Sequence, residues 1–364
     1  MKKNRIGIRV FLCVLSFAVC FSGFLALLSG RNSVLSSAVA DEIETTEAMT
    51  LNYSDGSVYD GDTLYGRVRN GTGTFKWNTG ESYSGRWEND TMTGEGKMVF
   101  PGLGEYEGGF ENDKRSGTGR FTWYYDGEPE EGAPVSYEGE WTGDQIGPTG
   151  KLMLSGIGTY EGAFQRQARH GEGTFTWLNG DVYTGQWAND AISGSGKLTL
   201  ADGTILEGTF NKGVLSKGSI TYAVDGGKAK RPVQNGRLQD SVEVQYSNGT
   251  TVSGKLKNQE FTGNVTIKYP TGDSYVGTMK SGVKSGKGTY TWKSGAHYVG
   301  EWANDKMSGT GKYYYGKAEN MLYLSGTFRN GTPYGTLEYV SDNRLRYTTT
   351  WSNGKCTNIA YKGR

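Results

Sequence analysis

The alternation of apolar and polar residues predicts short strands over most of the chain. Tyr183, Gly185 and Trp187 recur at every second residue, so their side chains would share one face of a strand. Asn189-Asp190 follows, and both residue types tolerate the left-handed backbone of a tight turn. A second alternating segment with two glycines then ends at another turn, Ala201-Asp202-Gly203. This pattern predicts a β-hairpin of about 23 residues with a turn at each end.

The same hairpin frame returns along the whole chain after residue 53. Most intervals between units are 23 residues, with 24 after Tyr59, 31 after Tyr106 and 26 after Tyr298. The frame persists at Leu206, Ala229 and Val252, where the aromatic residue is lost. Counted from the first aromatic or equivalent position, 13 units begin at residues 59, 83, 106, 137, 160, 183, 206, 229, 252, 275, 298, 324 and 347.

Six units carry the repeat signature most clearly. The signature is a Tyr, a Gly two residues later, in most of them a Trp or Phe after two more, and a Gly-x-Gly at the start of the second strand. The signature residues are Tyr83, Gly85, Trp87, Gly94, Gly96; Tyr106, Gly108, Phe110, Gly117, Gly119; Tyr160, Gly162, Phe164, Gly171, Gly173; Tyr183, Gly185, Trp187, Gly194, Gly196; Tyr275, Gly277, Gly286, Gly288; and Tyr298, Gly300, Trp302, Gly309, Gly311.

This signature resembles the MORN (membrane occupation and recognition nexus) repeat over about residues 53–360, with degenerate units around 206–274. The resemblance implies an all-β fold, an elongated single-layer antiparallel sheet of tandem hairpins, used as a scaffold or attachment module. Stacked hairpins would bury a ladder of Tyr, Trp and Phe rings. We interpret Gly185, Gly194 and Gly196 as letting these rings lie flat across the backbone. An alternative is that the glycines only permit twist and bulging.

The N-terminal segment predicts export from the cytoplasm. Basic residues precede an apolar run over residues 10–29, which is long enough to span a membrane as a helix. Residues 38–40, Ala-Val-Ala, also offer a cleavage site. Residues 1–40 are therefore either an uncleaved signal anchor or a signal peptide cleaved after Ala40. We expect residues 41–52 to form an acidic linker.

The glycine content is consistent with many tight turns, and the net charge restricts the classes of partner that we expect. Glycine makes up 58 of the 364 residues, about twice its usual share. Residues 1–40 hold five basic residues and no acid, so the remainder has a net charge of −4. Because this net charge is negative, we expect no nucleic-acid partner and only weak attraction to anionic lipid.

Two departures from the repeat stand out. Residues 124–136 lengthen one unit by about eight residues and hold four acids and two prolines. They are interpreted as a projecting turn, either a binding loop or a neutral insertion. The degenerate stretch 218–252 contains four basic residues, and we interpret it as a weakly packed hinge or a local basic patch. The last unit, at Tyr347, should cap the array.

The residues that carry chemistry are few, so we expect no enzyme, catalytic residue, cofactor or metal site. His170 and His297 occupy slots that other units fill with Ser or Val, which is typical of surface residues. Cys356 is the one cysteine outside the apolar run, and no catalytic motif occurs.

The sequence therefore favours a non-enzymatic, membrane-tethered scaffold that presents a β-surface to protein partners outside the membrane. The alternative is binding of surface polysaccharide, or of lipid head groups, through exposed aromatic rows. Buried rings would favour the scaffold, and an open row of rings would favour glycan binding. Open sheet edges would also allow a homodimer.

Overall fold

The computed structural model describes residues 46–257, 260–316, 322–341 and 343–363. Within them the chain forms 29 antiparallel strands of an open sheet and no helix. No helix among these residues is long and apolar enough to cross a membrane. The predicted N-terminal helix, residues 1–40, lies outside the described residues.

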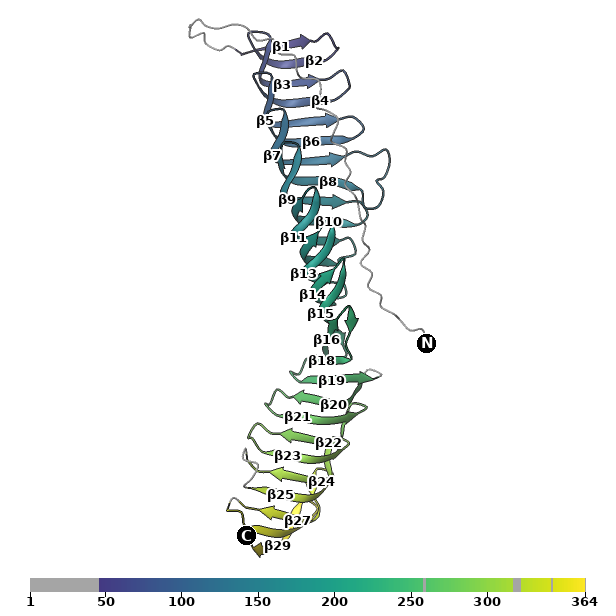
Figure 1. Cartoon of the computed structure of the whole chain (residues 1–364), viewed down its shortest axis with the longest axis vertical. Helices are drawn as coiled ribbons and strands as arrows, with labels where there is room; N and C mark the ends of the chain where they lie inside the picture. The colour runs from purple at the N-terminus through teal and green to yellow at the C-terminus, as the bar shows by residue number, and fades with distance from the viewer. Residues whose placement is uncertain (1–45, 258–259, 317–321, 342, 364) are drawn as a thin grey trace. The chain divides into compact units, whose positions relative to one another are not determined.

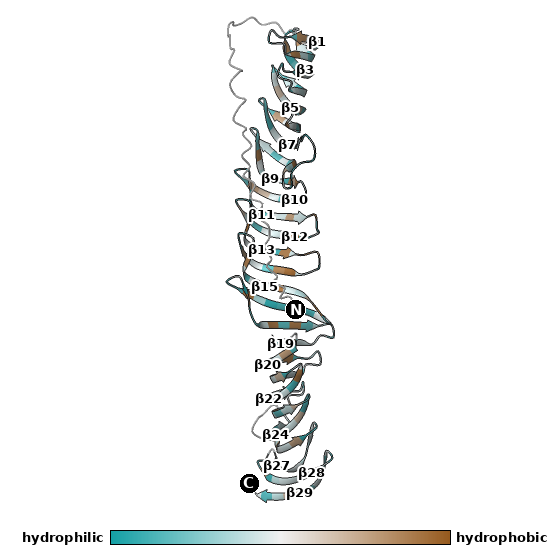
Figure 2. Cartoon of the chain, turned by 90° about the vertical axis from the view of Figure 1, so that its right-hand side faces the viewer, coloured by the Kyte–Doolittle hydropathy of each residue, from teal (hydrophilic) through white to brown (hydrophobic). Residues whose placement is uncertain are grey.

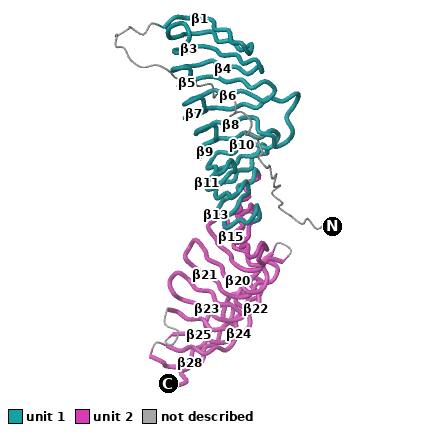
Figure 3. Tube along the Cα trace, turned by 45° about the horizontal axis from the view of Figure 1, so that its top comes forward, with its two compact units in different colours: residues 1–201, 208–214 teal, residues 202–207, 215–364 magenta. Residues whose placement is uncertain are grey.

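The chain divides into two compact units, coloured separately in Figure 3. Unit 1 comprises residues up to 201 and 208–214, and unit 2 comprises residues 202–207 and 215–364. Strand β14 (Ile205–Asn211) contains the point of division.

Unit 1 is an up-and-down succession of hairpins in sequence order (Figure 1). Its strands are β1 (Thr46–Asn52), β2 (Val58–Leu64), β3 (Val68–Lys76), β4 (Ser82–Glu88), β5 (Thr91–Phe100), β6 (Gly104–Glu111), β7 (Lys114–Trp123), β8 (Pro134–Thr142), β9 (Gln145–Leu154), β10 (Gly158–Gln165), β11 (Ala168–Trp177), β12 (Val182–Ala188) and β13 (Ala191–Thr199).

Unit 2 repeats this plan. Its strands are β15 (Val214–Val224), β16 (Gly227–Gln234), β17 (Arg237–Leu238), β18 (Ser241–Tyr246), β19 (Thr251–Lys257), β20 (Glu260–Lys268), β21 (Ser274–Lys280), β22 (Val283–Thr291), β23 (His297–Ala303), β24 (Lys306–Tyr314), β25 (Tyr323–Arg329), β26 (Thr332–Pro333), β27 (Gly335–Val340), β28 (Arg346–Ser352) and β29 (Lys355–Gly363).

The predicted turns are confirmed. Asn189 and Asp190 adopt φ values of 48° and 65°, and the same pair of left-handed residues recurs at Asn89-Asp90, Asn112-Asp113 and Asn304-Asp305. These two-residue turns all lie at one edge of the sheet, because each joins the first strand of a hairpin to the second. The longer turns between hairpins lie at the other edge.

The strands alternate in burial as well as in sequence. In β12 the buried residues Tyr183, Gly185 and Trp187 alternate with exposed or half-buried ones, and apolar and polar residues share the same strands in Figure 2. One face of each unit therefore carries the core, and the opposite face is largely in solvent.

The structure differs from the sequence interpretation at two places. Residues 46–52, expected as the end of an acidic linker, form β1 and pair with β2. The degenerate hairpins keep a packed face, because Ala229, Val242 and Val252 are at most 6% exposed. Small aliphatic side chains replace the rings there, so the stretch is not weakly packed.

Candidate interaction surfaces

A ladder of tyrosines forms the core of both units. The hydroxyl of each donates a hydrogen bond to the backbone oxygen three residues later, for example Tyr160 to Ala163 at 2.7 Å and Tyr275 to Thr278 at 2.9 Å. Because the hydroxyl is bonded, the ring can be buried to its tip. Eight tyrosines at this position are at most 1% exposed: Tyr59, Tyr83, Tyr106, Tyr137, Tyr160, Tyr183, Tyr275 and Tyr298.

Two glycines lie beneath each of these rings. Gly185 and Gly196 face each other across β12 and β13, and a Cβ on Gly196 would lie 2.2 Å from the Tyr183 hydroxyl oxygen. The flat-ring interpretation therefore holds for this pair. It is wrong for Gly194, which has a φ of +99° and whose added Cβ would meet Gln186 instead of a ring. The first glycine of the Gly-x-Gly accommodates backbone twist, and the second accommodates the ring.

In the hairpins that carry a Trp or Phe two residues after the first glycine, this second ring packs edge-on against the tyrosines. Trp187 lies 5.2 Å from Tyr160 and 5.5 Å from Tyr183, at 78° and 83°. Its indole N–H donates to the Gly173 oxygen at 3.2 Å, as Trp87, Trp141 and Trp302 do to the equivalent glycines. Each tryptophan thereby joins its own hairpin to the preceding one.

In three hairpins of unit 1, an arginine side chain binds the turn of the next hairpin, a contact that we call a clasp. The Arg169 backbone N–H and Nε both donate to Asp190 Oδ1 at 3.0 Å, and Nη2 donates to the Asp190 backbone oxygen at 3.0 Å. Its guanidinium lies 4.7 Å from the Trp187 ring centre. Arg69 and Arg115 bind Asp90 and Asp144 in the same way. Each clasp combines charged hydrogen bonds with a cation–π contact.

The clasps occur in every second hairpin of unit 1. Arg69, Arg115 and Arg169 precede a Trp in the next hairpin, whereas Met92, Ile146 and Ile192 precede a Phe. Unit 2 keeps the alternation at its C-terminal end, where Lys284 precedes Trp302 and Met307 precedes Phe328. The structural period is therefore two hairpins. The 23-residue period predicted from the sequence does not include it, although Arg followed by Trp recurs in unit 1 at intervals of 46 residues, or 54 where the insertion intervenes.

The polar strand face differs between the units. In unit 1 the cross-strand partners Lys97, Glu107, Arg120, Glu138, Lys151 and Glu161 alternate in charge along six successive strands. Opposite charges that face each other across strands stabilise a sheet modestly. In unit 2 the equivalent row reads Thr266, Val276, Thr289 and Val299, and Val276 and Val299 are 55% and 44% exposed.

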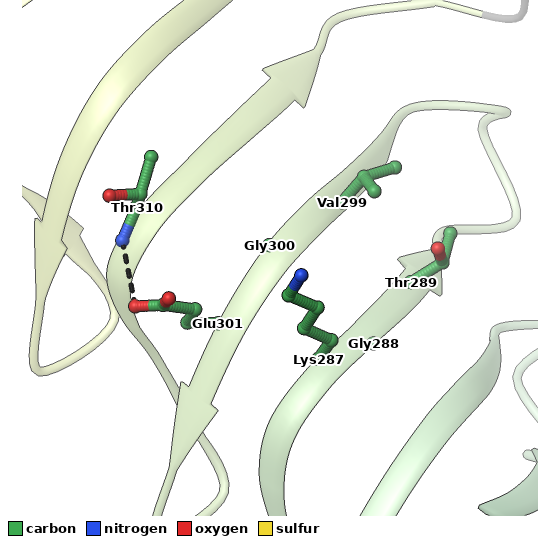
Figure 4. A pocket seen from close by; sticks show the side chains of 7 residues that line it. All are labelled: Lys287, Gly288, Thr289, Val299, Gly300, Glu301 and Thr310. Carbon is green, nitrogen blue, oxygen red and sulfur yellow. Dashed lines mark hydrogen bonds between the residues drawn. The ribbon is translucent and has the colours of Figure 1, made fainter.

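A shallow hollow lies on this face of unit 2 (Figure 4). It is lined by Lys287, Gly288, Thr289, Val299, Gly300, Glu301 and Thr310. Glu301 turns toward β24 and accepts a hydrogen bond from the Thr310 backbone N–H at 3.1 Å. The hollow is open, and its side chains are those of the repeat frame.

The two histidines differ in how far they are buried. His297 is only 7% exposed and stacks on Tyr314 at 4.4 Å between ring centres, so its prediction as a surface residue is wrong. The ring is buried because Tyr314 lies directly opposite it on the next strand. His170 is half-buried. Cys356 is exposed, and the described residues contain no group of three or more potential metal ligands.

The insertion at residues 124–136 does not simply project. Gly132 donates to the Ser155 oxygen at 2.6 Å and Ser155 donates to the Ala133 oxygen at 2.9 Å, so the segment is fastened to the next turn. The Tyr124 hydroxyl donates to Glu105, which also pairs with Lys97 at 2.9 Å. These two contacts lower the pKa of the Glu105 carboxyl.

The two units carry opposite net charges, which the sum of −4 for residues 41–364 does not show. From residue 41 onward, unit 1 holds 13 basic and 26 acidic side chains, a net charge of −13. Unit 2 holds 21 basic and 12 acidic side chains, a net charge of +9. The expectation of weak binding to anionic partners was therefore based on the sum of two opposite net charges.

Comparison with known proteins agrees with the repeat. The MORN repeat family model matches residues 83–102, 106–124, 160–182, 183–205, 275–297 and 298–317. No curated protein matches the chain.

Solved structures resemble the chain only loosely. The TCP domain of SAS-4 from Drosophila melanogaster, solved with a proline-rich motif of Ana2, is 12% identical over 53% of this chain and 85% of that one, with a TM-score of 0.22. Virginiamycin B lyase from Staphylococcus aureus (9% identity, 84% and 99% covered) and BamB from Moraxella catarrhalis (10%, 84% and 98%) both give a TM-score of 0.12. The six family matches, on the hairpins whose tyrosines and glycines pack as described, make this chain a MORN-repeat protein.

Proposed function

We propose that this protein is a non-enzymatic scaffold, tethered to a membrane by its N-terminal segment, whose strand faces bind protein partners outside the membrane. The observation that carries the proposal is the burial of the ring ladder. Eight core tyrosines are at most 1% exposed, so these rings are used to hold hairpins together.

The remaining surface suits contacts with proteins. Hairpins present equivalent side chains at regular intervals, as in other repeat proteins that bind along an extended face. In unit 2 the uncharged row at Thr266, Val276, Thr289 and Val299 lacks the alternating charges of unit 1. Less charge must be desolvated there when a partner binds. We therefore place the principal protein contact on this face.

Glycan or lipid binding through aromatic rows has less support. Exposed rings such as Tyr124 and Tyr315, at 42% and 43%, lie outside the core ladder, at turns between hairpins.

The test is affinity capture with the full-length chain from a detergent-solubilised membrane fraction. Val276→Asp with Val299→Asp should abolish recovery of a discrete partner. Leu178→Asp, at an exposed turn residue of unit 1, is the control and should leave recovery unchanged. Retention on purified wall polysaccharide with no protein partner, or equal recovery by both variants, would refute the proposal.

A further inference from the structure

The first and last strands of the chain each have a neighbouring strand on one side only. Among the described residues, β1 pairs only with β2, and β29 pairs only with β28. Each end strand therefore has a row of backbone N–H and C=O groups that faces no other strand. Strand β1 has seven residues and β29 has nine, and neither contains a proline. Edges of this kind can accept a further strand.

Both end strands also expose apolar side chains on the core face of the sheet. In β29, Ile359 and Tyr361 are 63% and 61% exposed, and the ring of Tyr361 lies 5.5 Å from that of Tyr347 on the core face of β28. In β1, Met49 is 39% exposed and lies opposite Gly61 of β2. Terminal repeats that close an array have a polar outer face. The last hairpin, expected to cap the array, therefore ends on apolar side chains that a further strand would cover.

The first and last hairpins carry opposite charges. Residues 46–64, from the start of β1 to the end of β2, hold four acids and no basic residue: Glu47, Asp55, Asp60 and Asp62. Residues 346–363, from the start of β28 to the end of β29, hold three basic residues and no acid: Arg346, Lys355 and Lys362. Arg346 forms an ion pair with Glu338 of the preceding hairpin, whereas Lys355 and Lys362 are exposed on β29 itself. The net charges are therefore −4 at the first hairpin and +3 at the last.

We propose that the protein associates head to tail with further copies of itself, β29 of one copy adding to β1 of the next. The pair places a hairpin of charge +3 beside one of charge −4, and it continues the apolar core face from Ile359 and Tyr361 to Met49. The two strands run parallel, because each is antiparallel to the tyrosine strand of its own hairpin. A parallel pair between separate chains needs no crossover connection. Backbone hydrogen bonds supply affinity, and the side chains supply specificity.

Like charges disfavour the two symmetric alternatives. Two β29 strands related by a two-fold axis would bring Lys355 and Lys362 of both copies into one interface, and two β1 strands would do the same with Glu47. Lysine on an edge strand is a common means of preventing pairing with an identical edge, and it suits an acidic edge. The head-to-tail contact leaves one β1 and one β29 free in every open oligomer, so association continues beyond a dimer. This inference is independent of the protein-binding face.

The test reverses charge at one end at a time in the full-length chain, in a neutral detergent, and measures assembly by sedimentation velocity as protein concentration rises. The first-hairpin variant carries Glu47→Lys with Asp60→Lys, and the last-hairpin variant carries Lys355→Glu with Lys362→Glu. Each variant alone should require a concentration at least about tenfold higher to assemble, because its contact loses charge complementarity. An equimolar mixture should form a one-to-one dimer and stop there. In that dimer the unchanged β29 of one variant meets the unchanged β1 of the other.

The matched control reverses two acids away from both end strands. Glu88 and Glu128 are exposed, and their joint replacement by Lys should change the concentration for assembly by less than about threefold, because distant charges are screened. Circular dichroism establishes that each variant is folded. A wild-type chain that stays monomeric, a first-hairpin variant that assembles like wild type, or a mixture that forms no dimer would overturn the proposal. Protein capture through Val276 and Val299 is a separate readout.

Discussion

At the scale of single residues, stability depends on rings that cross glycines at close range. Gly196 is the sharpest case, because a Cβ there would lie 2.2 Å from the Tyr183 hydroxyl oxygen. The ring cannot retreat without losing its 3.0 Å hydrogen bond to the Gln186 oxygen. We expect Gly196→Ala to destabilise the protein by about 1–3 kcal/mol, as overpacked cores do. Denaturant unfolding measures this cost.

The control for this substitution is Gly316→Ala. An added Cβ at Gly316 meets nothing within 4 Å, and its φ is not left-handed. Alanine there should be neutral or slightly stabilising, because it restricts the unfolded chain. Equal effects of the two substitutions would contradict the ring-over-glycine packing.

Trp187 tests the second ring of the core. It is 4% exposed, contacts both neighbouring tyrosines and donates to the Gly173 oxygen. Trp187→Ala should cost about 3–5 kcal/mol in denaturant unfolding, because it removes a large buried side chain and leaves a cavity. A loss well below about 1 kcal/mol, the range of surface substitutions, would show that this ring does not support the core.

At the scale of elements, the repeating unit is a pair of hairpins, one clasped by Arg and Trp and one packed by Ile or Met and Phe. The clasp is specific because Arg169 contacts both Trp187 and the turn at Asp190. Conversion of one type into the other therefore requires two changes.

A double-mutant cycle tests this coupling. Arg169→Ile and Trp187→Phe should each destabilise, and together they should cost less than the sum by about 0.5–3 kcal/mol, as residues in contact do. The control cycle combines Arg169→Ile with Trp141→Phe, a tryptophan that stacks with Arg115 instead. Unfolding energies in the control should add, and additivity in both cycles would refute the two-hairpin unit.

At the scale of the whole molecule, the tyrosine ladder should make the free energy of unfolding decrease as the pH rises through the alkaline range. Burial raises the pKa of Tyr83, Tyr183 and Tyr298 to about 12, whereas tyrosines of the unfolded chain titrate near 10. Between these values the folded state binds more protons than the unfolded state, so stability falls as pH rises.

We therefore expect cooperative unfolding between about pH 10 and 12, with each such tyrosine contributing up to about 1.4 kcal/mol per pH unit. Circular dichroism, together with tyrosinate absorbance, measures it. Tyr124 and Tyr125, about two-fifths exposed, serve as the internal contrast, since replacing them with Phe should leave the transition in place. Ionisation of all tyrosines near pH 10 without unfolding would contradict the ladder.

Several features were determined by sequence alone. The period of 23 residues, the strand alternation and turns such as Asn189-Asp190 are local, because backbone preference and the order of side chains fix them. The Tyr and Gly positions of the repeat followed from the same local pattern. The family followed from that pattern and is confirmed by the six matches.

Other features were decided only by tertiary contacts between hairpins. The burial of His297 depends on Tyr314 of the next strand, and the clasp of Arg169 depends on a turn 21 residues away. Residues 46–52 form a strand because β2 provides partners for their backbone. The grouping of charge into an acidic unit and a basic unit likewise emerged only with the division of the fold. A linear sequence gives each side chain and its neighbours, but packing across strands decides which of them meet.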